Sequence, residues 1–217
     1  MKINRTIVFL CNLFLFAAAA WTRPAVEVKA PVKTPPNKTV FSAGFEDGNG
    51  GFSPRSGNEV LTQTGEARHG GAYALKVENR TAGWHGPSLR IEAYLTQGKE
   101  YLLTLWVKLI DPEEARIQVS TQTGEGTAAT YSNITAKTVA LADGWVRLQG
   151  ACRYTNLSSG FITIYVESPN SPTASFYIDD VLIEELGVPP IVLENISPLH
   201  SRYTDQFLIG NIASLSD

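Results

Sequence analysis

The stretch EYLLTLWVKLI, Glu100–Ile110, decides the fold class because its side chains alternate in character. In a β-strand, successive side chains point to opposite faces of the sheet. Apolar side chains occur on both faces of this stretch, which is typical of a central strand in a stack of two sheets. One face carries Tyr101, Leu103, Leu105 and Val107, and the other carries Leu102, Thr104, Trp106 and Lys108.

The sequence on either side of this strand shows the same alternation of apolar and polar residues. From residue 40 to about residue 186, short alternating runs are separated by Gly, Asn, Ser and Pro, and none shows a sustained helical period. Many short strands with turn residues between them predict an all-β domain over residues 39–186, an antiparallel β-sandwich or jelly roll. We expect strands at 39–45, 59–64, 72–78, 88–93, 100–110, 115–123, 137–141, 145–155, 160–167 and 175–185.

The segment before the domain has two parts. Residues 1–20 have a positively charged start, an apolar run over residues 7–16 and four alanines at the end, which is the pattern of a secretory signal peptide. The apolar run is shorter than the roughly 20 residues that span a membrane. Residues 21–38 contain four prolines and no apolar periodicity, and they predict an extended linker. We therefore expect a secreted, extracellular protein that is not held in a membrane after cleavage.

The charge balance narrows the class of partner. Cleavage after Ala20 removes Lys2 and Arg5 but no acidic residue, so the formal net charge moves from −3 to −5. A mildly acidic exported protein is poorly suited to nucleic acid or to an anionic membrane surface. An uncharged partner suits it better, and we expect the chain to be a monomer.

The cysteines predict no disulfide and no catalytic thiol. Cys11 leaves with the signal peptide, so only Cys152 remains. Cys152 shares strand parity with Val146 and Leu148, which indicates a small buried side chain.

The stretch FITIYVE, residues 161–167, places an aromatic side chain beside a carboxylate. Strand parity puts Ile162, Ile164 and Val166 on one face, and Tyr165 and Glu167 together on the other, which need not be buried. A flat aromatic ring can cover the C–H face of a sugar, while a carboxylate accepts hydrogen bonds from its hydroxyls. This pair is therefore a candidate contact for a carbohydrate.

Three further side chains allow both a binding and a structural interpretation. Trp84 lies in the glycine-rich stretch NRTAGWHGPS, where it either faces solvent as a binding residue or caps the core. Tyr131 lies among small polar residues in TAATYSNIT and is equally ambiguous. Arg55, in FSPRSG, either contacts a ligand or is a solvated loop charge.

Catalysis within the domain is not expected. A glycosidase or lyase needs two carboxylates at a fixed separation, and the densest acidic run is YIDDVLIEE. Its adjacent Asp179 and Asp180 must point apart unless a bulge intervenes, and we expect this run to be solvated at the sheet edge. His69, His85 and His200 lie in different segments and suggest neither a catalytic triad nor a zinc site.

Four motifs together resemble the family 22 carbohydrate-binding modules, the xylan-binding β-sandwiches that accompany xylanases. They are GFEDGNGGFSPRSG, LKVENRTAGWHGPS, YVESPN and SFYIDDVLIEE, and their order matches across residues 40–186. The resemblance implies non-catalytic binding of xylan or mixed-linkage β-glucan. Phe52 stands where the family often has tryptophan, a change expected to affect packing more than binding. The cleft residues that carry over are Arg55, Trp84, Tyr131, Tyr165 and Glu167.

The resemblance also implies a structural calcium ion, Ca2+. Its expected ligands are Glu46 and Asp180, with Asp179 in reserve. As sequence alone, separated carboxylates are a weak calcium signal.

The tail has a resemblance of its own. Residues 187–217 begin with a linker, and their stretch ISPLHSRYTDQFLIGNIAS is similar to the start of a glycoside hydrolase family 10 TIM barrel, with a short helix before the first strand. Such barrels carry their catalytic glutamates on later strands. We therefore expect no catalytic residue in this chain and a parent endo-1,4-β-xylanase that the module tethers to plant cell-wall polysaccharide. The alternative is an accessory domain that stabilises the enzyme and binds little sugar.

Overall fold

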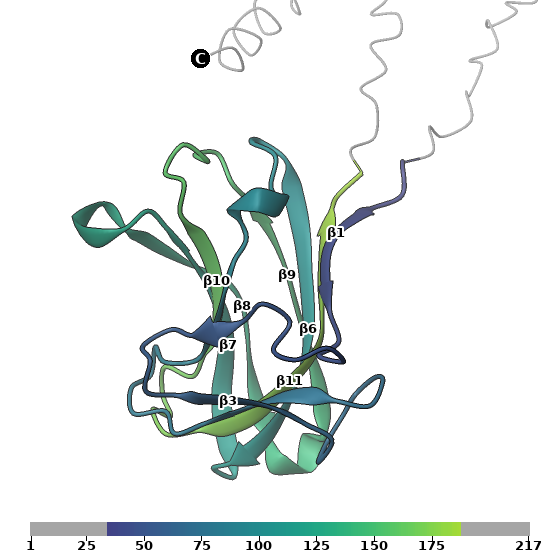
Figure 1. The fold of residues 1–217 in the computed structure, drawn as a ribbon, viewed down its shortest axis with the longest axis vertical. Coiled ribbons are helices and arrows are strands. Elements are labelled where there is room, and N and C mark those ends of the chain that lie inside the picture. Colours follow the sequence, from purple (N-terminus) through teal and green to yellow (C-terminus); the bar gives the residue numbers. More distant parts are fainter. Residues whose placement is uncertain (1–33, 188–217) are drawn as a thin grey trace, which may run out of the picture. The chain divides into compact units, whose positions relative to one another are not determined.

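The computed structural model describes residues 34–187, which form two facing antiparallel β-sheets (Figure 1). The predicted all-β sandwich is confirmed. The predicted signal peptide, most of the linker and the barrel-like tail lie outside the described residues. Within residues 34–187, the helical segments are short 3-10 turns: η1 (Glu92–Tyr94), η2 (Gly126–Ala128) and η3 (Leu141–Asp143). No helix in this range is long and apolar enough to cross a membrane.

The two sheets are called the β6 sheet and the β10 sheet, each after one of its inner strands. The β6 sheet has the order β3 (Val60–Thr64), β4 (Ala74–Glu78), β11 (Ser175–Glu185), β6 (Glu100–Asp111) and β9 (Trp145–Arg153), and β1 (Lys38–Ala43) also pairs with β11. The β10 sheet has the order β2 (Ser53–Pro54), β5 (Pro87–Arg90), β10 (Ile162–Glu167), β7 (Glu114–Thr123) and β8 (Thr130–Ala140).

The core lies between the sheets and follows the predicted alternation. The β6 stripe of Tyr101, Leu103, Leu105 and Val107 is buried, and so is the β10 stripe of Ile162, Ile164 and Val166. Phe52 packs in this same core, with its ring centroid 5.9 Å from that of Phe45, so it has a packing role. The opposite faces of both sheets are therefore the surfaces on which binding residues can lie.

The acidic run of β11 is not at a sheet edge, so the expectation of edge solvation was wrong. β11 pairs with β6 along one side and with β4 and β1 along the other. Asp179 on this strand is fully buried. A β-bulge interrupts the register between Asp179 and Leu182, and Asp180 has a positive φ of 46°. Such a bulge redirects side chains from the simple alternation. Both aspartates consequently contact the segment over residues 69–73.

β8 begins seven residues earlier than the predicted strand at 137–141. Its first half, TYSNITA, is polar and largely exposed, so it carries no apolar alternation to read. Pairing with β7 extends it, with Tyr131 opposite Gln122. This extension and the unpredicted two-residue β2 lie at the two opposite edges of the β10 sheet, and Tyr131 on the first and Arg55 just after the second both line the cleft described next.

Candidate functional site

A cleft of about 370 Å³ on the outer face of the β10 sheet brings together four of the five predicted site residues. Arg55 follows β2, Trp84 lies in the loop between β4 and β5, Tyr131 lies on β8 and Tyr165 lies on β10. Trp84 is 50% exposed and Tyr131 is 60% exposed, so both are open to a ligand rather than part of the core. The binding interpretation of these two aromatics therefore fits the structure.

Arg55 occupies the middle of this cleft. Its Cζ atom lies 3.5 Å from the ring centroid of Tyr165, 5.5 Å from that of Trp84 and 5.7 Å from that of Tyr131. A guanidinium over an aromatic face is held by the charge distribution of the ring. Nη2 donates to Gln122 Oε1 at 3.1 Å and Nη1 donates to the Trp84 carbonyl at 3.4 Å. The guanidinium is thus the floor between the two exposed rings.

Tyr165 differs from the sequence interpretation, which placed it on a face that need not be buried. It is only 4% exposed, because Arg55 covers its ring. Burial, followed by the nearby charge of Glu167, raises the pKa of the Tyr165 hydroxyl, and Arg55 opposes the shift. Tyr165 therefore supports Arg55 and presents a protonated hydroxyl rather than an open stacking surface.

Glu167 is held beside the cleft rather than in its lining. It is 7% exposed, and its Oε1 atom accepts hydrogen bonds from Gln118 Nε2 at 2.8 Å and Ser120 Oγ at 2.6 Å. Both donors lie on β7, the neighbouring strand. Glu167 is thus a fixed acceptor on the same sheet face as Tyr165, one pleat further along β10.

Arg80 is a buried residue that the sequence did not single out, and it fixes the loop that carries Trp84. Its five guanidinium N–H donors all find backbone carbonyl oxygens. Burial lowers the pKa of Arg80 to about 10, against the attraction of Glu167 and Glu59, so the group is charged at neutral pH. The acceptors are His85 (2.9 Å), Ser171 (3.1 Å), Ala174 (3.0 Å), Gly83 (2.9 Å) and Ser168 (3.4 Å). The Trp84 loop is thereby joined to the segment after β10.

Glu59 makes a second buried connection beneath the cleft. It accepts hydrogen bonds from the Ser56 hydroxyl, from the Ser56 N–H at 3.0 Å and from the Gly86 N–H at 3.0 Å. Burial by itself would raise the pKa of Glu59, but these hydrogen bonds bring it down to about 2. The carboxylate therefore ties the segment after Arg55 to the loop after Trp84. No pattern in the sequence signals this connection or that of Arg80, because both depend on loops distant in the chain.

Gly86 allows the close approach of the Trp84 loop to β10. Its φ is 155°, and a Cβ atom at this position would collide with the Val166 carbonyl oxygen. Only glycine fits there without moving one of the two segments.

The expected calcium ligands Glu46 and Asp180 lie against adjacent glycines of the segment over residues 69–73. A Cβ atom added at Gly70 would lie 2.7 Å from Asp180 Oδ2, and one at Gly71 would collide with Glu46 Oε1. The glycines thus make room for two carboxylates, the oxygen ligands that Ca2+ prefers. Within residues 34–187, no group of three or more His, Cys, Asp or Glu side chains is placed to hold a metal. Backbone carbonyls and water would have to complete the coordination.

Asp179, the reserve ligand, has a different role. Its Oδ2 atom accepts hydrogen bonds from the N–H groups of His69 at 2.8 Å and Gly70 at 3.2 Å, and Oδ1 accepts one from the Asp180 N–H at 2.7 Å. Burial raises the pKa of Asp179, and these hydrogen bonds oppose the increase. Three backbone donors thus engage both oxygens of Asp179. In Glu46 and Asp180 one oxygen each is engaged: Glu46 Oε1 accepts the N–H groups of Ala72 and Tyr73, and Asp180 Oδ2 lies 2.6 Å from His69 Nδ1. Their other oxygens therefore fit a cation better than Asp179 does.

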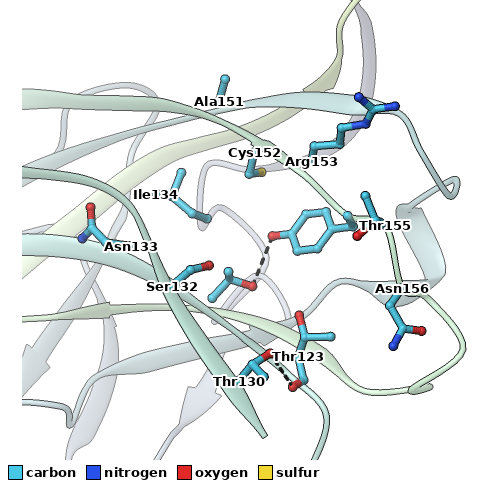
Figure 2. Close-up of a pocket in the computed structure, with 12 residues that line it drawn as sticks. Thr123, Thr130, Ser132, Asn133, Ile134, Ala151, Cys152, Arg153, Thr155 and Asn156 are labelled. Atoms are coloured by element: carbon cyan, nitrogen blue, oxygen red, sulfur yellow. Dashed lines mark hydrogen bonds between the residues drawn. The ribbon is translucent and has the colours of Figure 1, made fainter. Parts of the chain in front are cut away.

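A separate polar cavity of about 330 Å³ lies between the edge strands β8 and β9 (Figure 2). Hydroxyl groups line it: the Tyr154 hydroxyl donates to Thr121 Oγ1 at 3.2 Å, and Thr130 Oγ1 donates to the Thr123 carbonyl at 3.3 Å. Tyr154 is only 5% exposed, so this cavity offers no open aromatic surface. Cys152 in its wall is half-buried rather than buried as predicted, and partial burial raises the pKa of its thiol. The aromatic cleft is therefore the better candidate site.

Comparisons with known proteins agree with this geometry. The family described as "Carbohydrate binding domain" matches residues 37–173 of the chain. Endo-1,4-beta-xylanase A of Thermotoga neapolitana is 31% identical over 195 residues, which are 85% of this chain and 18% of that protein. The chain thus spans less than a fifth of that relative's length.

Two solved structures share the fold. The CBM22-1 xylan-binding domain from Paenibacillus barcinonensis Xyn10C superposes with a TM-score of 0.64 at 24% identity, covering 72% of this chain and 99% of that domain. The CBM22-2 xylan-binding domain of the same protein has a TM-score of 0.61 at 27% identity, covering 67% of this chain and 99% of that domain.

Proposed function

The chain belongs to the carbohydrate binding domain family, and on that premise we propose that its cleft binds xylan without chemistry of its own. The observation that carries the proposal is the convergence of Arg55, Trp84, Tyr131 and Tyr165 from four separate segments on one cleft. The xylan-binding domain that is 27% identical and the xylanase that is 31% identical support xylan as the ligand.

The two exposed aromatics supply the apolar part of the interaction. A buried aromatic side chain removes about 150–250 Å² from water. A sugar covers one side of the ring, so each of Trp84 and Tyr131 contributes about 2 kcal/mol at about 25 cal/mol per Å². Ordering of the sugar chain offsets part of this gain. With one charge-assisted hydrogen bond, the total is about −4 to −8 kcal/mol, which corresponds to a dissociation constant between micromolar and millimolar.

The polar groups of the cleft suit sugar hydroxyls. Arg55 has five N–H donors, and the structure engages its Nη1 and Nη2 atoms with Trp84 and Gln122. Its other N–H groups can donate to hydroxyls of a sugar lying between the two rings. The Tyr165 hydroxyl can donate or accept, and the Glu167 carboxylate accepts. This alternation of donors and acceptors over an apolar strip matches a neutral polysaccharide.

Affinity electrophoresis of the full chain in gels with soluble xylan, with mixed-linkage β-glucan and with neither tests the proposal. We expect retardation by xylan, and weaker retardation of Trp84→Ala and Tyr131→Ala. Tyr94→Ala is the matched control, because Tyr94 is 41% exposed but lies outside the cleft. Unretarded migration of the wild-type chain in both polysaccharides would contradict the proposal and favour a stabilising accessory domain.

The wider biological context extends this proposal. The names of the relatives support a parent endo-1,4-β-xylanase that this module tethers to plant cell-wall polysaccharide. Such a substrate lies outside the cell, which fits the signal peptide and secretion predicted from residues 1–20.

A structural calcium ion also belongs to the proposal. Glu46 and Asp180 would hold it, together with backbone carbonyls or water. When bound, it would supply charge neutralisation and link the segment over residues 69–73 to the bulge of β11.

A further inference from the structure

A second groove, of about 420 Å³, lies on the outer face of the β6 sheet. Three of its lining residues stand side by side across three strands: Ser42 on β1 pairs with Leu182 on β11, and Leu182 pairs with Thr104 on β6. Trp106 and Asp180 stand above this row. The groove is therefore on the opposite side of the sandwich from the cleft, and it is of similar volume.

Trp106 is fixed in place at the groove. The imidazole of His69 stacks on one face of the indole, with ring centroids 3.8 Å apart and an interplanar angle of 16°. His69 is oriented in turn, because its Nδ1 atom lies 2.6 Å from Asp180 Oδ2 and Trp145 packs edge-on against its ring at 5.9 Å. Trp106 therefore lines the groove as a fixed ring on which His69 is stacked.

The groove differs from the cleft in its aromatic part, because Trp106 is half-buried under His69 whereas Trp84 and Tyr131 are exposed. In both sites a planar polar group covers one side of an aromatic ring, Arg55 on Tyr165 and His69 on Trp106. The groove adds the Asp180 carboxylate, the Ser42 hydroxyl and the Leu182 side chain. The Thr104 hydroxyl accepts a hydrogen bond from Gln149 Nε2 at 3.0 Å, which orients it in the floor.

The apolar and polar side chains of the groove favour a ligand that is a neutral ring with many hydroxyl groups. Such a ligand can place its C–H groups against Leu182 and the indole of Trp106, and its hydroxyl groups can donate hydrogen bonds to the Asp180 carboxylate. An anion would meet the Asp180 carboxylate with like charge. A purely apolar segment would exclude water from the Asp180 Oδ1 atom, which accepts no hydrogen bond within residues 34–187, whereas Oδ2 lies 2.6 Å from His69 Nδ1; such desolvation is costly.

We propose that this groove is a second carbohydrate-binding site, so that one chain can hold two polysaccharide strands on opposite faces. The residues that line the groove support a carbohydrate site there, and the choice of xylan as its ligand rests on the proposed function. Stacked sheets pack about 10 Å apart, so the two sites are separated by the thickness of the sandwich. One short oligosaccharide cannot fill both sites, which makes the stoichiometry a direct readout.

Equilibrium dialysis of the full chain against xylohexaose, carried to saturation, tests the proposal. We expect two xylohexaose molecules per wild-type chain, and one in both Trp106→Ala and Ser42→Leu. The Ser42→Leu variant fills the groove from an exposed position and leaves the stacked rings intact. Thr138→Leu is the control, an exposed hydroxyl on β8 outside both sites, and it should still bind two.

The possible outcomes separate the two proposals. One xylohexaose per wild-type chain, lost in Trp84→Ala and kept in Trp106→Ala and Ser42→Leu, would overturn the second site and leave the cleft. One xylohexaose lost in Trp106→Ala and kept in Trp84→Ala would support the groove and contradict the cleft. Sedimentation of the wild type as a dimer that Ser42→Leu dissociates, with one xylohexaose per chain, would show self-association at the groove and overturn the proposal.

Discussion

Replacing Arg80 by methionine removes the buried cation that joins the Trp84 loop to the segment after β10. Methionine has a similar length but no N–H donor, so all five hydrogen bonds of the guanidinium are lost. The carbonyls of Gly83, Ser168 and Ser171 each keep a second, backbone N–H donor. Three of the bonds, those to His85, Ala174 and Ser168, are buried. The other two are partly buried, so water can replace the guanidinium there.

The expected magnitude follows from this division. The Ser168 carbonyl still accepts the Ser171 N–H at 3.3 Å, so the carbonyls of His85 and Ala174 are the two left buried and unsatisfied. Each such carbonyl costs about 1–3 kcal/mol, so the two would cost about 2–6 kcal/mol if the loops did not move. Relaxation lets water reach part of them, and we expect the free energy of unfolding to fall by about 2–4 kcal/mol. A typical domain has about 5–15 kcal/mol in total, so the variant should still fold at low temperature.

Urea unfolding followed by tryptophan fluorescence measures this loss, and xylohexaose titration in the absence of urea measures the effect on Trp84. We expect weaker binding by the folded variant, because the loop that carries Trp84 has lost its anchor. Arg116→Met is the matched control: Arg116 is exposed on β7, and its replacement should change stability by less than about 0.5 kcal/mol. A loss below about 1 kcal/mol in Arg80→Met, or unchanged affinity, would refute the anchoring role.

Three further predictions concern the supports of the site. The folded-state pKa of Glu59 is about 2, against an ordinary value of 4.5. The ionised carboxylate therefore contributes fully to the free energy of unfolding above pH 4.5, and this contribution is lost as the pH falls toward 2. Acid unfolding curves should show the loss in the wild type and a flatter dependence on pH in Glu59→Gln. Ser120→Ala removes the 2.6 Å hydrogen bond that orients Glu167. The loss of about 1 kcal/mol should weaken xylohexaose binding about fivefold, and an unchanged affinity would show that Glu167 does not contact the sugar. Chelation with EDTA should lower the melting temperature and added Ca2+ should restore it, and Asp180→Asn should abolish this response; equal melting curves with and without Ca2+ would contradict the proposed calcium site.

Alternation predicted the parts of the fold that depend on burial. The stripes of β6 and β10 are buried as expected, because one side of each strand must face the opposite sheet. The start of β8 was missed, since its polar sequence takes strand geometry from pairing with β7. A bulge at Asp179 and Asp180 was left open as an alternative, and the structure contains it: it brings both aspartates of β11 to one loop.

The prediction of the site was also incomplete, because contacts between distant segments cannot be read from a local pattern. Parity indicated Tyr165 and Glu167, residue type left Arg55, Trp84 and Tyr131 open between a binding and a structural role, and the resemblance assigned all five to the cleft. None of these could show that Arg55 lies on the ring of Tyr165, because this contact joins segments that are more than a hundred residues apart in the chain. Arg80 and Glu59 were missed for a related reason: their partners are backbone atoms of loops, which leave no signature in residue type.

The binding constant of the full chain for xylohexaose, compared between wild type and Trp84→Ala by calorimetry, tests the central claim most directly. The wild type should bind through the cleft with a dissociation constant between micromolar and millimolar. Trp84→Ala, which removes about 2 kcal/mol of apolar contact from an exposed position, should weaken that binding about 30-fold while the melting temperature stays near that of the wild type. Absence of heat with the wild type, or equal affinity in the two proteins, would contradict the account.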